Sequence, residues 1–295
     1  MKKLLMFLLV FLVLGIVSAQ AQDLEYFKVY TPQSGMSADE IMQIKYHNKY
    51  SIYAHDYNST SIIKYIDPSG FTRTKEAIRK RIVLAGENGI SYKDLIVVTE
   101  PTLSKGLAVL TWTYEDVTRD QDTWLWIPSL KKVRKISASE DDDAFMGSDL
   151  TVEEVSTRRL EDEDYSLLRE DTFGGYVYEE TGETKFEGEA CFVIECIPKK
   201  PHWYYSKRVI WVSKDTGGNI FEEYYDKNGT LFKTIFRDWI WFDRGDGTMY
   251  PIQENVEGKD LRTGHRTIVA LADSKYDEGA SEGDFTVRIL ERSKW

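Results

Sequence analysis

Aromatic and β-branched residues recur with a period of two in several short segments, and this spacing is the strongest constraint on the fold. Successive side chains of a strand point to opposite faces of a sheet, so the period predicts strands. The segments are 107–114, 123–127, 204–212, 220–225 and 231–242. Turn sequences at 67–70, 86–89, 215–218, 226–229 and 243–247 separate strand-like regions. Short strands and short turns predict a meander of antiparallel hairpins, and they argue against a doubly wound α/β fold.

Two of these segments, 123–127 and 231–242, carry apolar side chains on both faces. Trp124 and Trp126 point one way while Leu125 and Ile127 point the other. A sheet with one face in water would alternate apolar with polar residues. Both faces must therefore be covered. Core and helices can supply that cover, or part of one face can line a cavity for an apolar ligand, and the sequence leaves both explanations open.

One helix is indicated by its N-terminal residues. Ser37 and Glu40 have the spacing of a capping box, and Met36 and Ile41 are placed to form a hydrophobic staple around it. We therefore predict a helix from about residue 38 to the early fifties, with one face against the sheet.

The N-terminus has the three parts of a secretory signal peptide. Two lysines precede the apolar run 4–17, and Ala19 and Ala21 supply the small residues that a signal peptidase requires. The run is shorter than the ~20 residues of a membrane-spanning helix. We expect cleavage after Ala21, with an uncleaved anchor as the alternative, and a single domain over 22–295 with no transmembrane segment.

Charge is unevenly distributed along the chain. The sequence holds 49 acidic and 38 basic residues, a formal net charge of −11, which argues against nucleic-acid binding by phosphate neutralisation. Thirteen acids and only three bases lie between residues 140 and 171. The apolar residues 144–147 interrupt this stretch, so we predict a partly helical excursion in which Phe145 and Met146 press against the sheet.

The two cysteines, Cys191 and Cys196, lie in one predicted strand. An offset of five residues puts their side chains on opposite faces, roughly 16 Å apart. That separation is too large for a disulfide, so we expect free, buried thiols.

No catalytic or cofactor-binding motif stands out. The four histidines are scattered, and the chain has neither a nucleophile elbow nor a glycine-rich phosphate loop. We therefore expect no enzymatic activity, no metal and no cofactor, with a hydrolase that uses unrecognised carboxylates as the less favoured alternative.

A basic cluster follows the turn at 128–132. It consists of Lys131, Lys132, Arg134 and Lys135. Such a cluster can be a solvated edge that resists aggregation. It can equally be a docking patch for anionic headgroups or for an acidic partner surface.

Several stretches together resemble the outer-membrane lipoprotein-sorting proteins of the LolA/LolB-like superfamily. They are 122–136 (DTWLWIPSLKKVRKI), 145–151 (FMGSDLT), 189–194, 209–212, 222–229 and 284–290. These stretches are spread over most of 105–290, and FMGSDLT is the most specific of them. The resemblance implies a mainly β (α+β) fold, in which a strongly curved antiparallel sheet forms an unclosed barrel and helices plug its apolar concave face.

The resemblance also implies a function. Relatives carry the acyl chains of lipoproteins or other lipids across the periplasm, without catalysis, towards the outer membrane. The implied partners are acyl chains and an inner-membrane exporter or an outer-membrane acceptor. Candidate cavity residues are Trp112, Trp124, Trp126, Phe145 and Met146, and strand alternation groups the tryptophans without identifying the concave face. The alternative is a periplasmic sensor or adaptor of the same fold that binds and regulates a membrane partner.

Overall fold

The structure, a computed structural model, describes residues 24–136, 142–155 and 158–292. Within these ranges thirteen strands form one antiparallel sheet in the order β6-β5-β4-β3-β2-β1-β13-β12-β11-β10-β9-β8-β7. In chain order the strands are β1 (Asp56–Ile66), β2 (Thr72–Val83), β3 (Ile90–Glu100), β4 (Ala108–Tyr114), β5 (Asp122–Ile127), β6 (Lys132–Ile136), β7 (Glu163–Tyr178), β8 (Glu183–Pro198), β9 (Lys207–Ser213), β10 (Asn219–Tyr225), β11 (Leu231–Asp243), β12 (Met249–Asp260) and β13 (Arg266–Tyr276). The helices described are α1 (Ala38–Tyr50), α2 (Val152–Val155) and α3 (Val287–Arg292).

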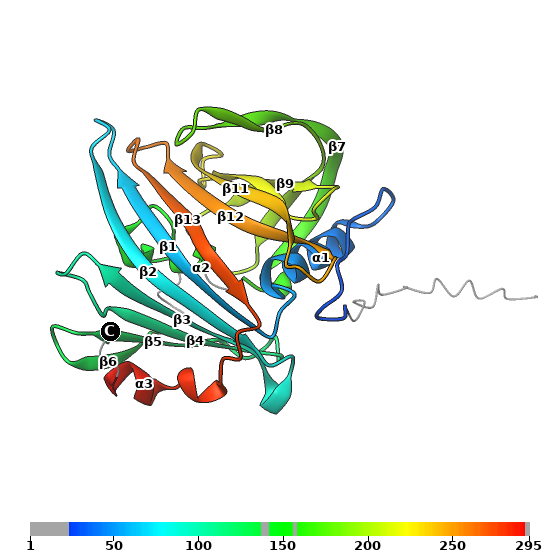
Figure 1. Ribbon diagram of the computed structural model, residues 1–295. Helices are drawn as coiled ribbons and strands as arrows, with labels where there is room; N and C mark the ends of the chain where they lie inside the picture. The colour runs from blue at the N-terminus through cyan, green and yellow to red at the C-terminus, as the bar shows by residue number, and fades with distance from the viewer. Residues whose placement is uncertain (1–23, 137–141, 156–157, 293–295) are drawn as a thin grey trace, which may run out of the picture.

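The sheet curves strongly but does not close, because β6 and β7 remain its two edges (Figure 1). In the middle of the sheet, β1 pairs with β13, so the first and last strands of the chain are neighbours. Between β6 and β7, the described residues 142–155 include α2 and lie on the concave side. The resulting unclosed barrel confirms the mainly β fold class with a curved antiparallel sheet.

Helix α1 confirms the capping prediction. It begins at Ala38 with Ser37 as its N-cap, and Ser37 and Glu40 bond each other's backbone in a capping box. One face of the helix packs against β8 and β9, where Ile41 and Met42 contact Phe192 and Ile210.

The predicted strands correspond closely to β4, β5, β10 and β11. The expected strand 204–212 is shorter, because β9 begins only at Lys207. Before it, Trp203 and Tyr205 pack into a buried cluster beneath Leu150 instead of pairing in the sheet. The strand carrying both cysteines is β8, and both thiols are free and buried, as expected.

The prediction for the acidic stretch 140–171 is partly wrong. Short helical turns do occur at Phe145–Gly147 and in α2, but residues from Glu163 onwards form β7, a strand paired with β8 along its length. The first two acids of the stretch lie outside the described residues.

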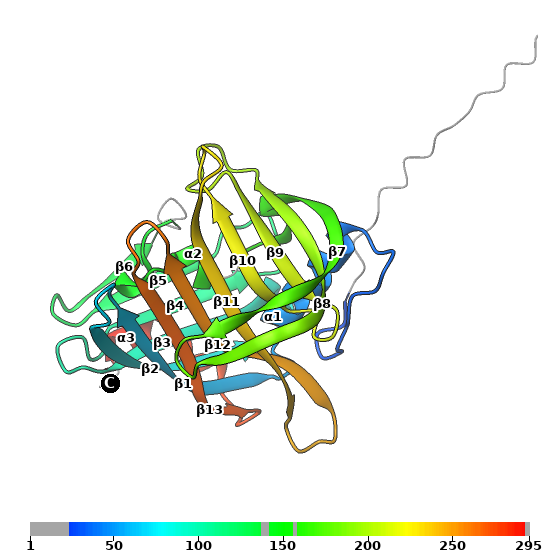
Figure 2. The same cartoon turned by 90° about the horizontal axis from the view of Figure 1, so that it is seen from above.

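Different elements cover the two faces of the sheet. On the concave side lie α1 and α2, while the long β7–β8 hairpin folds back across the convex side of β10–β12 (Figure 2). There Tyr176 and Phe186 pack against Phe236. At the other end of the convex side, α3 packs over β4 and β5. This cover explains why so many strands are apolar on both faces.

Candidate ligand-binding site

The concave side of β2–β6 encloses a cavity of about 310 Å³. Small-ligand sites in proteins span roughly 300–1,000 Å³. Its apolar wall includes Ile96, Val109, Leu125 and Ile136 from the strands, together with Leu107 just before β4. Along β4, Val109 is half-buried whereas its neighbours Ala108 and Leu110, which face α3, are completely buried. The concave face of these strands is therefore open apolar surface next to a packed convex face.

A second cavity of about 130 Å³ lies beneath the C-terminal end of α1. Tyr50, Ile63 and Val256 are among the residues that line it. Four residues line both cavities, namely Arg79, Ile96, Phe145 and Val155. The two cavities are thus adjacent, and residues from the β6–β7 connection form part of the wall of each.

We call residues 142–155 the plug, because this segment crosses the concave side and supplies one wall of the larger cavity. Phe145 and Met146 lie in it, and both are half-buried and line that cavity. The carbonyl of Met146 accepts hydrogen bonds from Lys75 Nζ at 2.9 Å and from the Tyr65 hydroxyl at 3.3 Å. The plug therefore reaches strands β1 and β2 through polar contacts.

Leu150 and Asp149 anchor the other end of the plug. Leu150 is 1% exposed and packs with Ile235 and Val256. The Asp149 backbone N–H donates to Thr267 Oγ1 at 3.0 Å, and that hydroxyl donates to Asp149 Oδ2 at 2.8 Å. This reciprocal pair of hydrogen bonds ties the plug directly to β13.

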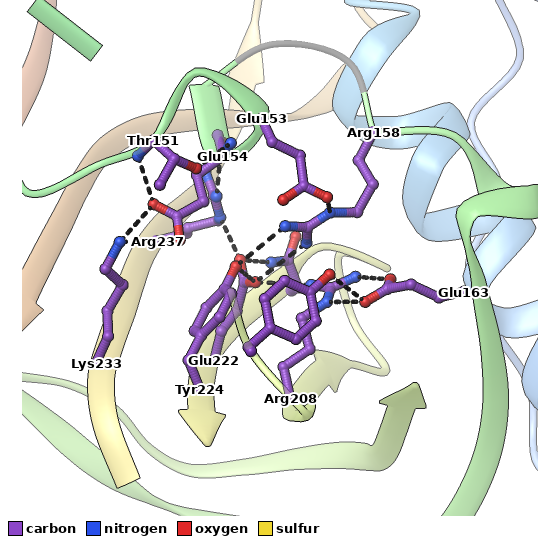
Figure 3. Close-up of polar contacts among 12 residues, drawn as sticks. Thr151, Glu153, Glu154, Arg158, Glu163, Arg208, Glu222, Tyr224, Lys233 and Arg237 are labelled. Atoms are coloured by element: carbon purple, nitrogen blue, oxygen red, sulfur yellow. Dashed lines mark hydrogen bonds and ion pairs between the residues drawn. The ribbon is translucent and has the colours of Figure 1, made fainter. Parts of the chain in front are cut away.

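A buried ion network lies next to this anchor (Figure 3). Its eight members are the acids Glu153, Glu154, Glu163 and Glu222 and the bases Arg158, Arg208, Lys233 and Arg237, and all are buried. They come from α2, the segment after it, and strands β7, β9, β10 and β11. The four acids and four bases balance in charge, which is the condition under which so many ionised groups can stay away from water.

The centre of the network is Arg208, which is 0% exposed. It donates from Nε and Nη2 to Glu163 at 2.7 and 2.5 Å, and from Nη1 to Glu222 at 2.7 Å. Glu222 also accepts from Arg237 Nε at 2.7 Å. Burial alone would raise the pKa of Glu163, but the Arg208 guanidinium holds it at about 2.

The two remaining pairs join the plug to β11 and to the segment that follows α2. Lys233 on β11 donates to Glu154 Oε1 and Oε2 at 3.1 and 2.9 Å, and Arg158 Nε donates to Glu153 at 2.8 Å. Each of the four carboxylates is thus bonded by a cation.

Lys45 of α1 lies beside the network but outside its charge balance. Its side chain is 1% exposed, with the ammonium 3.9 Å from the Tyr46 ring centroid. Burial and the positive charge of Arg208 lower the pKa of Lys45 well below its usual range.

The structure places Trp112, Trp124 and Trp126 together on the convex face. They pack against the cluster that contains Phe285, and Trp112 Nε1 donates to the carbonyl of Phe285 at 2.9 Å. Strand alternation grouped them correctly, but α3 covers their face, and the walls of both described cavities consist of other residues. From β5 it is Thr123 and Leu125 that line the larger cavity.

The basic cluster is divided between the two faces of β6. Lys132 and Arg134 share the face of Leu125, and Arg134 lines the larger cavity. Lys135 points to the other face, where its ammonium lies 2.5 Å from Asp122. Lys131 lies in the β5–β6 turn with a positive φ of 49° and is exposed. Alternation along a strand therefore gives the four side chains different surroundings.

Among the described residues, no group of three or more His, Cys, Asp or Glu side chains is arranged to hold a metal ion. Of the helices that the structure describes, none is long and apolar enough to cross a membrane.

Comparisons with known proteins agree with this geometry. A family model with the description "Uncharacterized protein" matches residues 91–292. A crystallised domain from Vibrio parahaemolyticus, described as an outer-membrane lipoprotein-sorting protein, is 24% identical with a TM-score of 0.71, covering 86% of this chain and 98% of that one. A DUF1329 family protein from Desulfovibrio piger is 26% identical with a TM-score of 0.66, covering 80% and 92%.

A third solved structure is a LolA superfamily protein from Nitrosomonas europaea. It is 18% identical with a TM-score of 0.59, covering 86% of this chain and 99% of that one. A search of curated proteins finds no sequence match. At these identities the structural likenesses show a shared LolA-like fold.

Proposed function

This chain is a LolA-like protein, a member of the family whose model matches residues 91–292, and on that premise we propose that it is a carrier for the acyl chain of a lipoprotein or another lipid. The observation that carries the proposal is the apolar cavity of about 310 Å³ between the concave face of β2–β6 and the plug. An acyl chain needs an apolar surface that is accessible in the free protein, and the half-buried Val109 and Leu125 supply it.

The energetics favour a carrier that needs no chemistry. Each buried methylene contributes about 0.8 kcal/mol to the free energy of binding. Burial of a 16-carbon chain therefore contributes more than ~10 kcal/mol, before the opposing costs of binding are subtracted. Release requires that the wall can open. Polar contacts hold the plug to β1, β2 and β13, and water can replace such contacts when the segment moves.

Location and partners form part of the same proposal. The expected signal peptide, 1–21, lies outside the described residues. Its cleavage would deliver the rest of the chain to the periplasm, where acyl chains must be shielded between two membranes. Lys131 and Lys132 are exposed at the β5–β6 turn, which suits docking on anionic headgroups or on an exporter or outer-membrane acceptor.

The test is direct measurement of ligand binding. The full chain, exported and purified without detergent, should release lipid on organic extraction and should bind a fluorescent fatty acid. Val109→Trp places an indole in the cavity and should weaken binding at least about tenfold. Its control is Val117→Trp, which changes an exposed residue of the β4–β5 turn and should leave binding unchanged.

Two results would contradict the proposal. One is an absence of both extracted lipid and fatty-acid binding in the folded protein. The other is equal binding by Val109→Trp and the unchanged chain, provided that thermal melting shows the variant to be folded, because a filled cavity cannot hold the same chain.

A further inference from the structure

Two guanidinium groups share one carboxylate in the wall between the cavities. Arg81, 3% exposed, donates from Nε to Asp94 Oδ1 at 3.0 Å and also bonds Asp94 Oδ2. Its third nitrogen donates to the carbonyl of Tyr50 at 2.8 Å. Arg81 therefore makes the main hydrogen bonds to the Asp94 carboxylate.

Arg79 is the weakly paired member of this trio. Its Nη2 lies 3.5 Å from Asp94 Oδ2, at the limit of a hydrogen bond, and its Nε is buried with no hydrogen-bond partner among the described residues. One carboxylate cannot balance two guanidiniums, so a unit of positive charge is left at Arg79. A buried donor without a partner carries a desolvation cost of about 1–3 kcal/mol.

The charge on Arg79 bears on which ligand the cavity binds, because of where Arg79 lies. Arg79 lines both cavities, and Arg134 lines the larger one. Among the described residues, the acids in that lining are Asp94, already bonded to Arg81, and Asp143 of the plug, which is exposed. The apolar cavity thus has a cationic group in its wall.

We infer that the carried ligand is a single-chain amphiphile with an anionic head group, whose carboxylate or phosphate pairs with Arg79 while its chain lies along Val109 and Leu125. The inference rests on the proposed carrier function and names the substrate class. A planar guanidinium can donate to two oxygens of either anion at once, and its charge is worth more in a wall of low polarity than in water.

The experiment compares three probes that have the same chain and different head groups: palmitate, hexadecyl phosphate and hexadecanol. Affinities are measured for the full chain by displacement of a fluorescent fatty acid. We expect at least one anionic probe to bind at least about tenfold more tightly than hexadecanol, which corresponds to about 1.4 kcal/mol. The stronger of the two anionic probes identifies the head group as carboxylate or phosphate.

Arg79→Gln should remove this preference and leave hexadecanol binding unchanged, which also shows that the cavity is intact. The matched control is Lys80→Gln, which makes the same change of charge one residue along β2, where the side chain points to the opposite face. It should keep the preference.

The outcomes separate the two proposals. Equal binding of all three probes by the unchanged chain, or a preference that survives Arg79→Gln, would overturn the head-group inference and leave the carrier function standing. Failure of all three probes to bind would overturn the head-group inference, and if the purified chain also released no lipid on extraction it would overturn the carrier function itself.

Discussion

Arg208 on β9 and Glu163 at the start of β7 form a buried pair, joined by two hydrogen bonds of 2.7 and 2.5 Å. These strands are not neighbours in the sheet, since β8 lies between them. The pair therefore reaches across β8 on the concave side and helps to hold the sheet edge that α1 covers.

Acid should weaken the fold through this pair. The pKa of Glu163 is about 2 in the folded protein against an ordinary 4.5. A lowered pKa stabilises the folded state above pH 4.5, and that stability is lost as the pH falls towards 2. The loss from Glu163 is about 3 kcal/mol. Urea unfolding between pH 5 and pH 2 measures it, and a Glu163→Gln variant with the same pH dependence as the unchanged chain would contradict the assignment.

Adding a side chain at Gly258 should destabilise the folded protein. A Cβ there would lie 2.6 Å from Leu150 Cδ2, so the plug would have to shift. We expect Gly258→Ala to destabilise the protein by about 1–3 kcal/mol. The double variant Gly258→Ala with Leu150→Ala should show non-additive free energies, because the second change removes the clash. Additive values in thermal or urea unfolding would indicate that Leu150 does not pack there.

Replacing Lys233 alone should destabilise the protein more than replacing Lys233 and Glu154 together. Lys233→Met leaves Glu154 buried without its cation, which costs about 3–5 kcal/mol. Adding Glu154→Gln should recover part of that loss, since the uncompensated charge is gone. Unfolding free energies of the two variants provide the test, and a double variant that is less stable than Lys233→Met would refute the pairing.

The last helix should contribute substantially to stability. Phe285, just before α3, is completely buried among residues of β3 and β4. Phe285→Ala should cost about 3–5 kcal/mol through lost contacts and the cavity left behind. Arg288→Ala, an exposed position of the same helix, should change the unfolding free energy by less than about 0.5 kcal/mol. Similar losses in the two variants would mean that α3 is not docked as described.

The elements that could be predicted from sequence are those whose residues act locally. Ser37 and Glu40 cap α1 through contacts three residues apart, and the alternation of aromatic residues identified β4, β5, β10 and β11. The prediction of a disulfide-free strand for Cys191 and Cys196 also held, because an offset of five residues places two side chains on opposite faces of any regular strand.

The candidate site was only partly predictable. Phe145 and Met146 attracted attention as apolar residues within an acidic stretch, and both line the larger cavity. Arg79 was not predicted as a site residue, because the sequence of β2, TRTKEAIRKRIV, is typical of an exposed basic segment. The spacing of two residues between Arg79 and Arg81 predicts that both side chains lie on one face of the strand. Only the contact with Asp94 of β3 shows how the two guanidiniums are paired.

The sequence by itself determined that this chain forms antiparallel strands with apolar residues on both faces and one capped helix, since alternation and capping depend on neighbours along the chain. Only the tertiary structure decided which face became the cavity. Trp112 and Val109 are equally suited to either side of β4, and the difference lies in α3, which covers the tryptophan side from nearly 180 residues away. The ion network likewise depends on pairs between segments that are distant along the chain. In the sequence these charged residues resemble exposed ones, and only the fold buries them against one another.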